Sequence, residues 1–272
     1  MIPVDLSGKT VLVTGGTRGL GRAIAEQFSR AGASVFVTHL WGSVPEEELA
    51  AGFEREHLRP PQVVECDTSD SEANRALMAV IQEKTGRLDA IVSNVAFTKI
   101  VRGLEEMKKS TLDLSLGYSA WPVVDMVQAS QAVLGKFPRY VIGISSDGGQ
   151  VCHEGYDLIG VAKSALETLD RYLAMRLKKH GVRVNTIRCG YLDTASSRAF
   201  GDELLDSIKK KAGEIFLDPR RVAGVCVALC SGLMDSVTGQ VIVVDEGWSL
   251  VSPIAYLAGK GNPGEFPPDE LP

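Results

Sequence analysis

The sequence lacks the features that mark several large classes of protein. It has no uninterrupted apolar run of the roughly 18 residues that a membrane-spanning helix needs. Its start has neither the basic residues nor the long apolar stretch of a signal peptide. The net charge is -5 and no basic cluster is present, whereas nucleic-acid binding needs clustered Lys and Arg. We therefore expect a cytoplasmic protein that has neither a membrane nor a nucleic acid as partner.

Cysteine is also scarce, and its spacing argues against two kinds of chemistry. The five cysteines are odd in number and form neither a CxxC motif nor a histidine-paired metal spacing. We therefore expect reduced thiols and no metal site. Cys226 and Cys230 lie four residues apart and are expected to fill the core face of a helix. The other three are Cys66, Cys152 and Cys189.

The sequence does contain an alternation of short β-rich apolar runs with longer stretches of helical periodicity. This alternation is typical of a parallel sheet with crossover helices. We predict an α/β fold, a Rossmann-type doubly wound sheet of seven parallel strands in a single domain, residues 1–255. Residues 256–272, rich in Gly, Pro and acid, are expected to form a tail. The predicted strands span residues 10–14, 34–38, 62–65, 88–93, 139–145, 183–188 and 240–245.

Two helices are predicted from local sequence signals. The pattern predicts one long helix from about Thr111 to Leu134, which carries Tyr118 and Trp121. The pair Asp218-Pro219 supplies an N-cap and a first-turn proline, and predicts the start of the last helix.

A glycine-rich loop follows the first predicted strand. The segment TGGTRGLG places Gly15, Gly19 and Gly21 between that strand and an amphipathic helix. Glycines let the backbone turn tightly and approach a pyrophosphate, whose charge is bound by free N–H groups and the positive end of the helix. A tight turn without a ligand is the alternative. The order of strand, loop and helix favours phosphate binding.

Tyr156 and Lys163 are the strongest candidates for chemistry. They lie seven residues apart in a segment predicted to be helical, and two helical turns cover about 7.2 residues, so both project from nearly the same face. An ammonium beside a phenol would lower the pKa of the phenol. The alternative is that Tyr156 is an aromatic residue at the rim of a site and Lys163 a solvated charge.

These motifs, in this order, resemble the short-chain dehydrogenase/reductase superfamily from about Gly8 to Leu250. The resemblance implies a nicotinamide cofactor, with Asp67 holding the adenine amino group and Thr194 meeting the nicotinamide carboxamide. The sequence departs from the family pattern at SNVA, which replaces NNAG, and at Cys189, which replaces a proline. The cofactor-binding residues that it implies are Gly15, Thr17, Arg18, Gly19, Leu20, Gly21, His39, Asp67, Thr68, Asn94, Lys163, Gly190, Leu192 and Thr194.

Two further departures concern catalysis. The usual tyrosine of the superfamily, four residues before the lysine, is Ile159 here, and its relay asparagine is Ser115. The enoyl-acyl-carrier-protein reductases instead carry tyrosine, six residues and lysine, which matches Tyr156 and Lys163. The compact glycine loop and Ser146, ten residues before Tyr156, make the chain most similar to the NADPH-dependent type III enzymes.

In that branch hydride reaches the β-carbon of an enoyl thioester, and the resemblance gives Tyr156 the role of stabilising the enolate oxygen and Lys163 that of holding the ribose. Ser146 is a third catalytic candidate, with a role in capping the next turn as its alternative. His153 is left outside the catalytic set, because a lone histidine is more often structural. Two other functions stay open: reduction of a ketone or aldehyde, and non-catalytic binding of NADP.

The expected partners follow from the same residues. The second predicted strand ends in Thr38 and His39, with no carboxylate to repel a 2'-phosphate, and Arg18 can pair with that phosphate, so NADPH is favoured over NADH. The substrate is expected to be a small molecule or a carrier-bound acyl group. The resemblance also implies a homodimer or homotetramer, packed through the helices of Trp121 and Tyr156.

Overall fold

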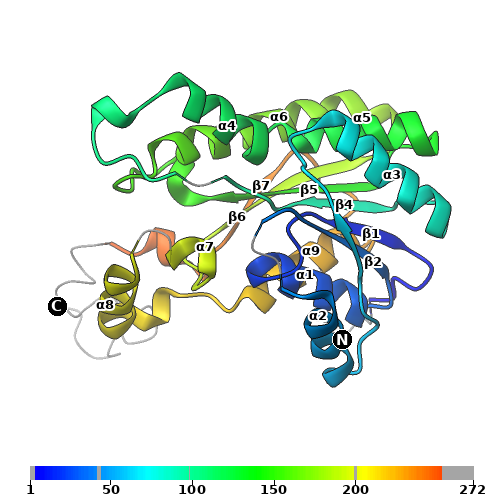
Figure 1. Ribbon diagram of the computed structural model, residues 1–272, viewed down its shortest axis with the longest axis horizontal. Coiled ribbons are helices and arrows are strands. Elements are labelled where there is room, and N and C mark those ends of the chain that lie inside the picture. Colours follow the sequence, from blue (N-terminus) through cyan, green and yellow to red (C-terminus); the bar gives the residue numbers. More distant parts are fainter. Residues whose placement is uncertain (1–3, 42–43, 98, 199–200, 253–272) are drawn as a thin grey trace, which may run out of the picture.

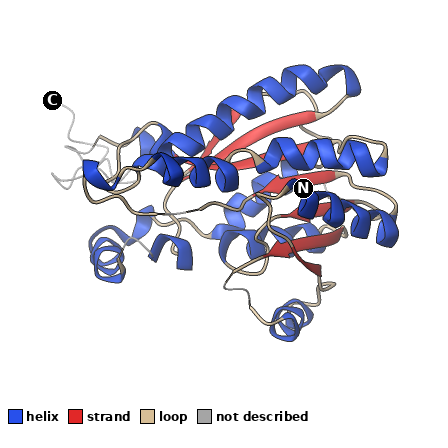
Figure 2. Ribbon diagram, turned by 45° about the horizontal axis from the view of Figure 1, so that its top comes forward, coloured by secondary structure: helices blue, strands red, loops and turns tan. Residues whose placement is uncertain are grey.

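Seven parallel strands form one sheet, as predicted, and their order is β3-β2-β1-β4-β5-β6-β7 (Figures 1 and 2). The structure is a computed structural model and describes residues 4–41, 44–97, 99–198 and 201–252, so the expected tail lies outside the described residues. The strands are β1 Thr10–Val13, β2 Ser34–His39, β3 Gln62–Glu65, β4 Ala90–Ser93, β5 Tyr140–Ser146, β6 Arg183–Cys189 and β7 Val241–Val244.

The central strands β1 and β4 are buried along their whole length because both faces of the sheet are covered. All four residues of β1 are buried, and their side chains alternate between two cores. Val11 and Val13 belong to one hydrophobic cluster, whereas Leu12 belongs to the other. This period of two, with helices on both faces, is what a parallel sheet requires.

Helices cover the two faces of the sheet as separate layers. One layer contains α3, α4, α5 and α6, and the other contains α1, α2 and α9 (Figure 1). The α-helices are α1 Gly19–Arg30, α2 Glu46–Arg55, α3 Ser71–Thr85, α4 Lys109–Ser119, α5 Pro122–Leu134, α6 Asp157–Leu177, α7 Ala195–Arg198, α8 Asp202–Ala212 and α9 Pro219–Leu229. Short 3-10 turns span Leu104–Glu106, Asp147–Gly149, Lys178–His180, Gly213–Ile215 and Trp248–Leu250.

The predicted long helix from Thr111 to Leu134 is wrong, because two helices, α4 and α5, occupy this stretch. Ala120 leaves helical geometry, with φ -125° and ψ -53°. Pro122 explains the break: it has no N–H to donate, and its ring would clash with the carbonyl four residues earlier. It is instead the first residue of α5, where a missing N–H costs nothing.

The predictions for the last helix are confirmed. The Asp218 side chain accepts a hydrogen bond from the Arg220 N–H at the start of α9. Cys226 is fully buried within α9, and Cys230 is buried just after the helix ends. All five cysteines have free thiols. Among the described residues, no helix combines the length and apolar character needed to cross a membrane, and no cluster of side chains could hold a metal ion.

Candidate active site

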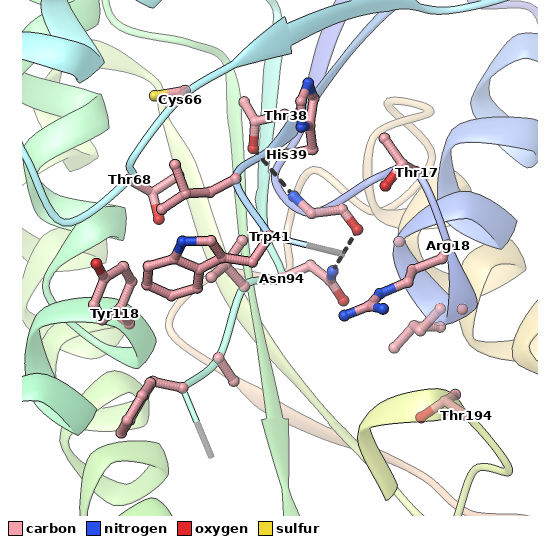
Figure 3. A pocket seen from close by; sticks show the side chains of 18 of the residues that line it. Thr17, Arg18, Thr38, His39, Trp41, Cys66, Thr68, Asn94, Tyr118 and Thr194 are labelled. Carbon is pink, nitrogen blue, oxygen red and sulfur yellow. Dashed lines mark hydrogen bonds between the residues drawn. The ribbon is translucent and has the colours of Figure 1, made fainter. Parts of the chain in front are cut away.

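A cavity of about 480 Å³ opens at the carboxyl ends of β1, β2 and β4. The order of the sheet reverses there, since β1 pairs with β2 on one side and with β4 on the other, and ligands of doubly wound folds bind at this switch point. It is lined by Gly15, Thr17, Arg18, Gly19, Leu20, Gly21, Thr38, His39, Leu40, Trp41, Cys66, Thr68, Asn94, Val95, Ala96, Phe97, Tyr118, Leu192 and Thr194 (Figure 3).

The glycine loop has the geometry that a phosphate-binding turn requires. Gly15 and Gly19 have φ of +63° and +56°, a left-handed conformation that favours glycine. A Cβ atom at Gly21 would collide with the Gly15 carbonyl oxygen, so only glycine fits there. Helix α1 begins at Gly19 without a side-chain cap, and its first N–H groups are therefore free for an anion.

Hydrogen bonds tie the loop to the neighbouring strands. Gly15 N–H donates to Thr38 Oγ1 at 3.1 Å. Asn94 Nδ2 donates to the Thr14 carbonyl at 2.9 Å, and the Asn94 N–H donates to Thr14 Oγ1, also at 2.9 Å. The altered SNVA turn therefore keeps its asparagine in a positioning role. Figure 3 shows Asn94 and Thr38 on either side of this loop.

The structure brings Tyr156 and Ser146 together. Ser146 ends β5, Tyr156 is the residue just before α6, and their hydroxyl oxygens lie 3.0 Å apart. Burial raises the pKa of Tyr156 above its ordinary value, and Asp147 and Cys189 also raise it, while the bond to Ser146 lowers it. The predicted lowering of this pKa is therefore wrong. The physical reason is that desolvation of the phenol is the largest influence on it.

Lys163 lies on α6, and its side chain is buried. Its Nζ donates to the Ile144 carbonyl of β5 at 2.7 Å. Burial lowers the pKa of Lys163 to about 8, partly opposed by the neighbouring acidic groups Cys189, Asp170 and Glu167. The lysine is thus not the solvated charge of the alternative interpretation. It does not line the cavity, nor do Asp67 and Gly190 from the predicted cofactor set, whereas the other members of that set do.

A buried ion pair lies one turn further along α6. Arg188 on β6 donates to both oxygens of Glu167, from Nε at 3.0 Å and from Nη2 at 2.6 Å. Ser145 Oγ, adjacent to Ser146, donates to the same carboxylate at 2.8 Å. The pair therefore fixes the end of β5 against α6.

Sequence reasoning missed a polar cluster next to Tyr156. His153 Nε2 lies 3.0 Å from an Asp147 carboxylate oxygen, and its Nδ1 lies 3.4 Å from the Tyr191 hydroxyl. The imidazole also meets the Tyr156 ring edge-on, with the ring centroids 6.0 Å apart. This cluster was hard to predict from the sequence, because Asp147 and His153 come together only through the turn that follows β5.

Three aromatic residues of the cavity, Trp41, Phe97 and Tyr118, were also missed. Tyr118 comes from the helix that was expected to pack between subunits, but it faces the cavity and its hydroxyl donates to Asp67 Oδ2 at 3.0 Å. The sequence feature that could have placed Tyr118 at the cavity is its position three residues after Ser115, which puts both side chains on the same face of α4. The Ser115 hydroxyl is itself buried and has no hydrogen-bond partner among the described residues.

Comparisons with known proteins agree with this geometry. Residues 15–249 match the family described as enoyl-(acyl carrier protein) reductase. Enoyl-(acyl-carrier-protein) reductase (NADH) FabI of Nostoc is 28% identical, covering 91% of this chain and 99% of the relative. 3-Oxoacyl-(acyl-carrier-protein) reductase FabG of Vibrio harveyi is 27% identical, covering 91% and 100%. A dehydrogenase/reductase from Sinorhizobium meliloti superposes with a TM-score of 0.79 at 28% identity, covering 90% and 96%.

Proposed function

Because the chain belongs to the short-chain dehydrogenase/reductase family and is an oxidoreductase, we propose that it reduces the double bond of an enoyl thioester with NADPH. The observation that carries this proposal is the hydroxyl pair of Ser146 and Tyr156, 3.0 Å apart, with the buried Lys163 seven residues after the tyrosine. A non-catalytic scaffold is set aside by the family membership.

The raised pKa of Tyr156 suits this reaction. A phenol that stays protonated at neutral pH is a hydrogen-bond donor, and an enolate oxygen needs a donor. Ser146 supplies a second hydroxyl toward the same point. A donor aimed at developing charge in a dry site is commonly worth about 3 kcal/mol of barrier. A bound nicotinamide would supply the hydride for the β-carbon, and Tyr156 would stabilise the charge that collects on the carbonyl oxygen.

Lys163 holds its place through one of three N–H donors, given to the Ile144 carbonyl. With a pKa of about 8, it is mostly protonated at neutral pH, and its other donors are available for the hydroxyl groups of a ribose. We assign it to cofactor positioning, because its burial leaves no room for free movement.

The cavity residues fit a nicotinamide dinucleotide, since the Gly15–Gly21 loop and the start of α1 suit a pyrophosphate. The proposed preference for NADPH rests on the exposed Arg18 and on His39, which line the cavity where an NAD enzyme would carry an acid. This proposed cofactor preference differs from that of the Nostoc relative, whose name specifies NADH.

Ketone reduction is the second candidate. The Ser146 and Tyr156 hydroxyls would polarise a ketone oxygen as readily as a thioester oxygen, and the Vibrio harveyi relative is named for the reduction of 3-oxoacyl groups. The two reactions differ in which carbon accepts the hydride, so a product assay separates them.

We further propose a homo-oligomer, homodimer or homotetramer, in the cytoplasm. Its support is a set of large apolar side chains exposed along α4 and α6 and at the junction of α4 with α5. They are Leu114, Trp121, Val161, Tyr172 and Met175, and Tyr172 and Met175 are the most exposed of them, at 65% and 70%.

The test compares Tyr156→Phe with the parent enzyme on crotonyl thioesters and a panel of ketones, following NADPH oxidation and identifying the product. Loss of the hydroxyl should lower turnover about a hundredfold or more, with little change in cofactor affinity. Lys163→Ala should weaken both binding and turnover. Circular dichroism must show folded protein in each case. Parent-like turnover of the enoyl thioester by Tyr156→Phe would exclude the assignment, and turnover of ketones alone would favour the second candidate.

A further inference from the structure

The polar cluster beside Tyr156 places a carboxylate, an imidazole and a phenol in a row. His153 is the middle member, with Nε2 at 3.0 Å from an Asp147 oxygen and Nδ1 at 3.4 Å from the Tyr191 hydroxyl. Its ring meets the rings of Tyr156 and Tyr191 edge-on, with centroids 6.0 Å and 5.8 Å apart. Within the described residues, Asp147, Tyr156 and Tyr191 are thus the titratable groups that contact the imidazole.

The turn after β5 holds one end of this row against the catalytic pair. Asp147 follows Ser146 directly and begins the 3-10 turn Asp147–Gly149. The turn packs so closely that a Cβ atom at Gly148 would collide with the Tyr156 ring. The carboxylate of Asp147 is therefore fixed beside the two hydroxyls that would bind the substrate oxygen.

The loop after β6 holds the other end. The Tyr191 carbonyl accepts the Leu217 N–H at 2.8 Å, and the Tyr191 ring meets Phe216 edge-on at 6.2 Å. Leu192 and Thr194, which follow in the same loop, line the cofactor cavity. The row thus runs from the catalytic pair to the rim of that cavity.

Each member of the row suits the transfer of a proton. His153 Nε2 is buried and has no well-aligned hydrogen bond among the described residues, so Asp147 acts on it through its charge and holds a proton on Nε2. The proton that an imidazolium can release is then on Nδ1, toward Tyr191. Burial raises the pKa of Tyr191, and Asp147 raises it further, so this hydroxyl keeps its proton at neutral pH and can donate it. The 3.4 Å distance is long, as catalytic hydrogen bonds often are before substrate binds.

We propose that Asp147, His153 and Tyr191 form a relay that supplies the proton which follows the hydride. The Nδ1 proton of the imidazolium moves to the Tyr191 oxygen while the Tyr191 hydroxyl proton moves to the α-carbon of the enolate. The enolate electron pair forms the new C–H bond, and the carbonyl double bond forms again. The side chain of His153 is 27% exposed, so the neutral imidazole regains a proton from water. The relay rests on the proposed function in requiring an acceptor that becomes negatively charged after hydride transfer; in ketone reduction the same proton would go to the alkoxide oxygen.

The first experiment needs no substrate. The chain has four histidines, so nitrogen NMR can assign the ring of His153 with the single variant His153→Gln. The neutral ring should carry its proton on Nε2, and Asp147→Asn should weaken that preference. A neutral ring protonated mainly on Nδ1 would overturn the relay, whichever substrate the enzyme reduces.

The second experiment measures turnover together with NADPH affinity. His153→Gln should lower turnover about a hundredfold at neutral pH and leave the NADPH dissociation constant unchanged, because an acid in this role contributes about that factor. Imidazole added to the buffer should restore part of the lost turnover, which it could not do for a merely structural histidine. The matched control is His180→Gln at the opposite end of α6, where the ring packs on Phe137, and it should keep the parent turnover. Parent-like turnover of folded His153→Gln, or a loss without rescue by imidazole, would overturn the proposal.

The third experiment follows the proton itself. Reduction of a crotonyl thioester in deuterium oxide should place deuterium on the α-carbon in one configuration, because the relay reaches one face of the enolate. His153→Gln and Tyr191→Phe should each give a mixture of configurations. A mixture from the parent enzyme would overturn the relay even though enoyl reduction is confirmed. If the parent reduces only ketones, the proposed function fails, and the turnover and imidazole rescue of His153→Gln on the ketone still decide the relay.

Discussion

Arg188→Met should be among the most destabilising single changes in this protein. It removes both bonds to Glu167, whose side chain is only 8% exposed, and leaves that carboxylate with Ser145 as its single side-chain donor within the described part of the chain. Breaking one side of a buried ion pair costs about 3–5 kcal/mol, because a charge is left without its partner. Domains have unfolding free energies of about 5–15 kcal/mol, so this is a large part of the total.

The control is the double variant Glu167→Leu with Arg188→Met, which replaces the pair by apolar side chains of similar size. It should lie within about 1 kcal/mol of the parent, or above it, because neither charge is left buried alone. Unfolding in urea, followed by circular dichroism at a fixed protein concentration, gives the free energies, and a double-mutant cycle gives the coupling. A loss below about 1 kcal/mol in Arg188→Met, or a double variant as unstable as the single one, would refute this reasoning.

Three further predictions concern pH, cofactor choice and assembly. Burial raises the pKa of Asp170 from 3.8 to about 7, so the folded state keeps a proton that the unfolded chain releases. Stability should therefore fall as pH rises from about 4 to about 7, by up to about 4 kcal/mol, and Asp170→Asn should flatten this slope in urea unfolding at several pH values. Arg18→Ala should weaken NADPH and not NADH; equal losses in a titration would show that Arg18 does not read the 2'-phosphate. Light scattering at micromolar concentration should give a dimer or tetramer, and a monomer would contradict the role of the exposed Tyr172 face.

The sheet could be predicted because most of its strands are short runs rich in apolar and β-branched residues. Residues 62–65 form β3 as predicted, and the other strands differ by one or two residues at their ends. The glycine loop could also be predicted, since its glycines must adopt left-handed geometry or pack closely against the backbone. Local rules decide both features, so a single sequence contains enough information for them.

Contacts between distant segments could not be predicted in the same way. Trp41 and Tyr118 meet across 77 positions of the sequence, and nothing in either segment alone indicates the other. The direction of the pKa shift of Tyr156 depends on how deeply the phenol is buried, which spacing along a helix does not reveal. The break at Pro122 was visible in the sequence, but the apolar periodicity continued across it and favoured one helix.

The pairing of β1 with β4 also has a consequence for how the chain folds during synthesis. The β1–β3 half of the sheet is complete in sequence before β4 leaves the ribosome, and the two halves join only where Val11 to Val13 pair with Ala90 to Val92. Until then β1 presents an open edge, and exposed edges invite pairing with other chains. Because Asn94 follows β4 and ties down the Thr14 carbonyl, the same event that closes this edge also completes the cofactor loop. Cofactor binding by a nascent chain would thus require that β1 has already paired with β4.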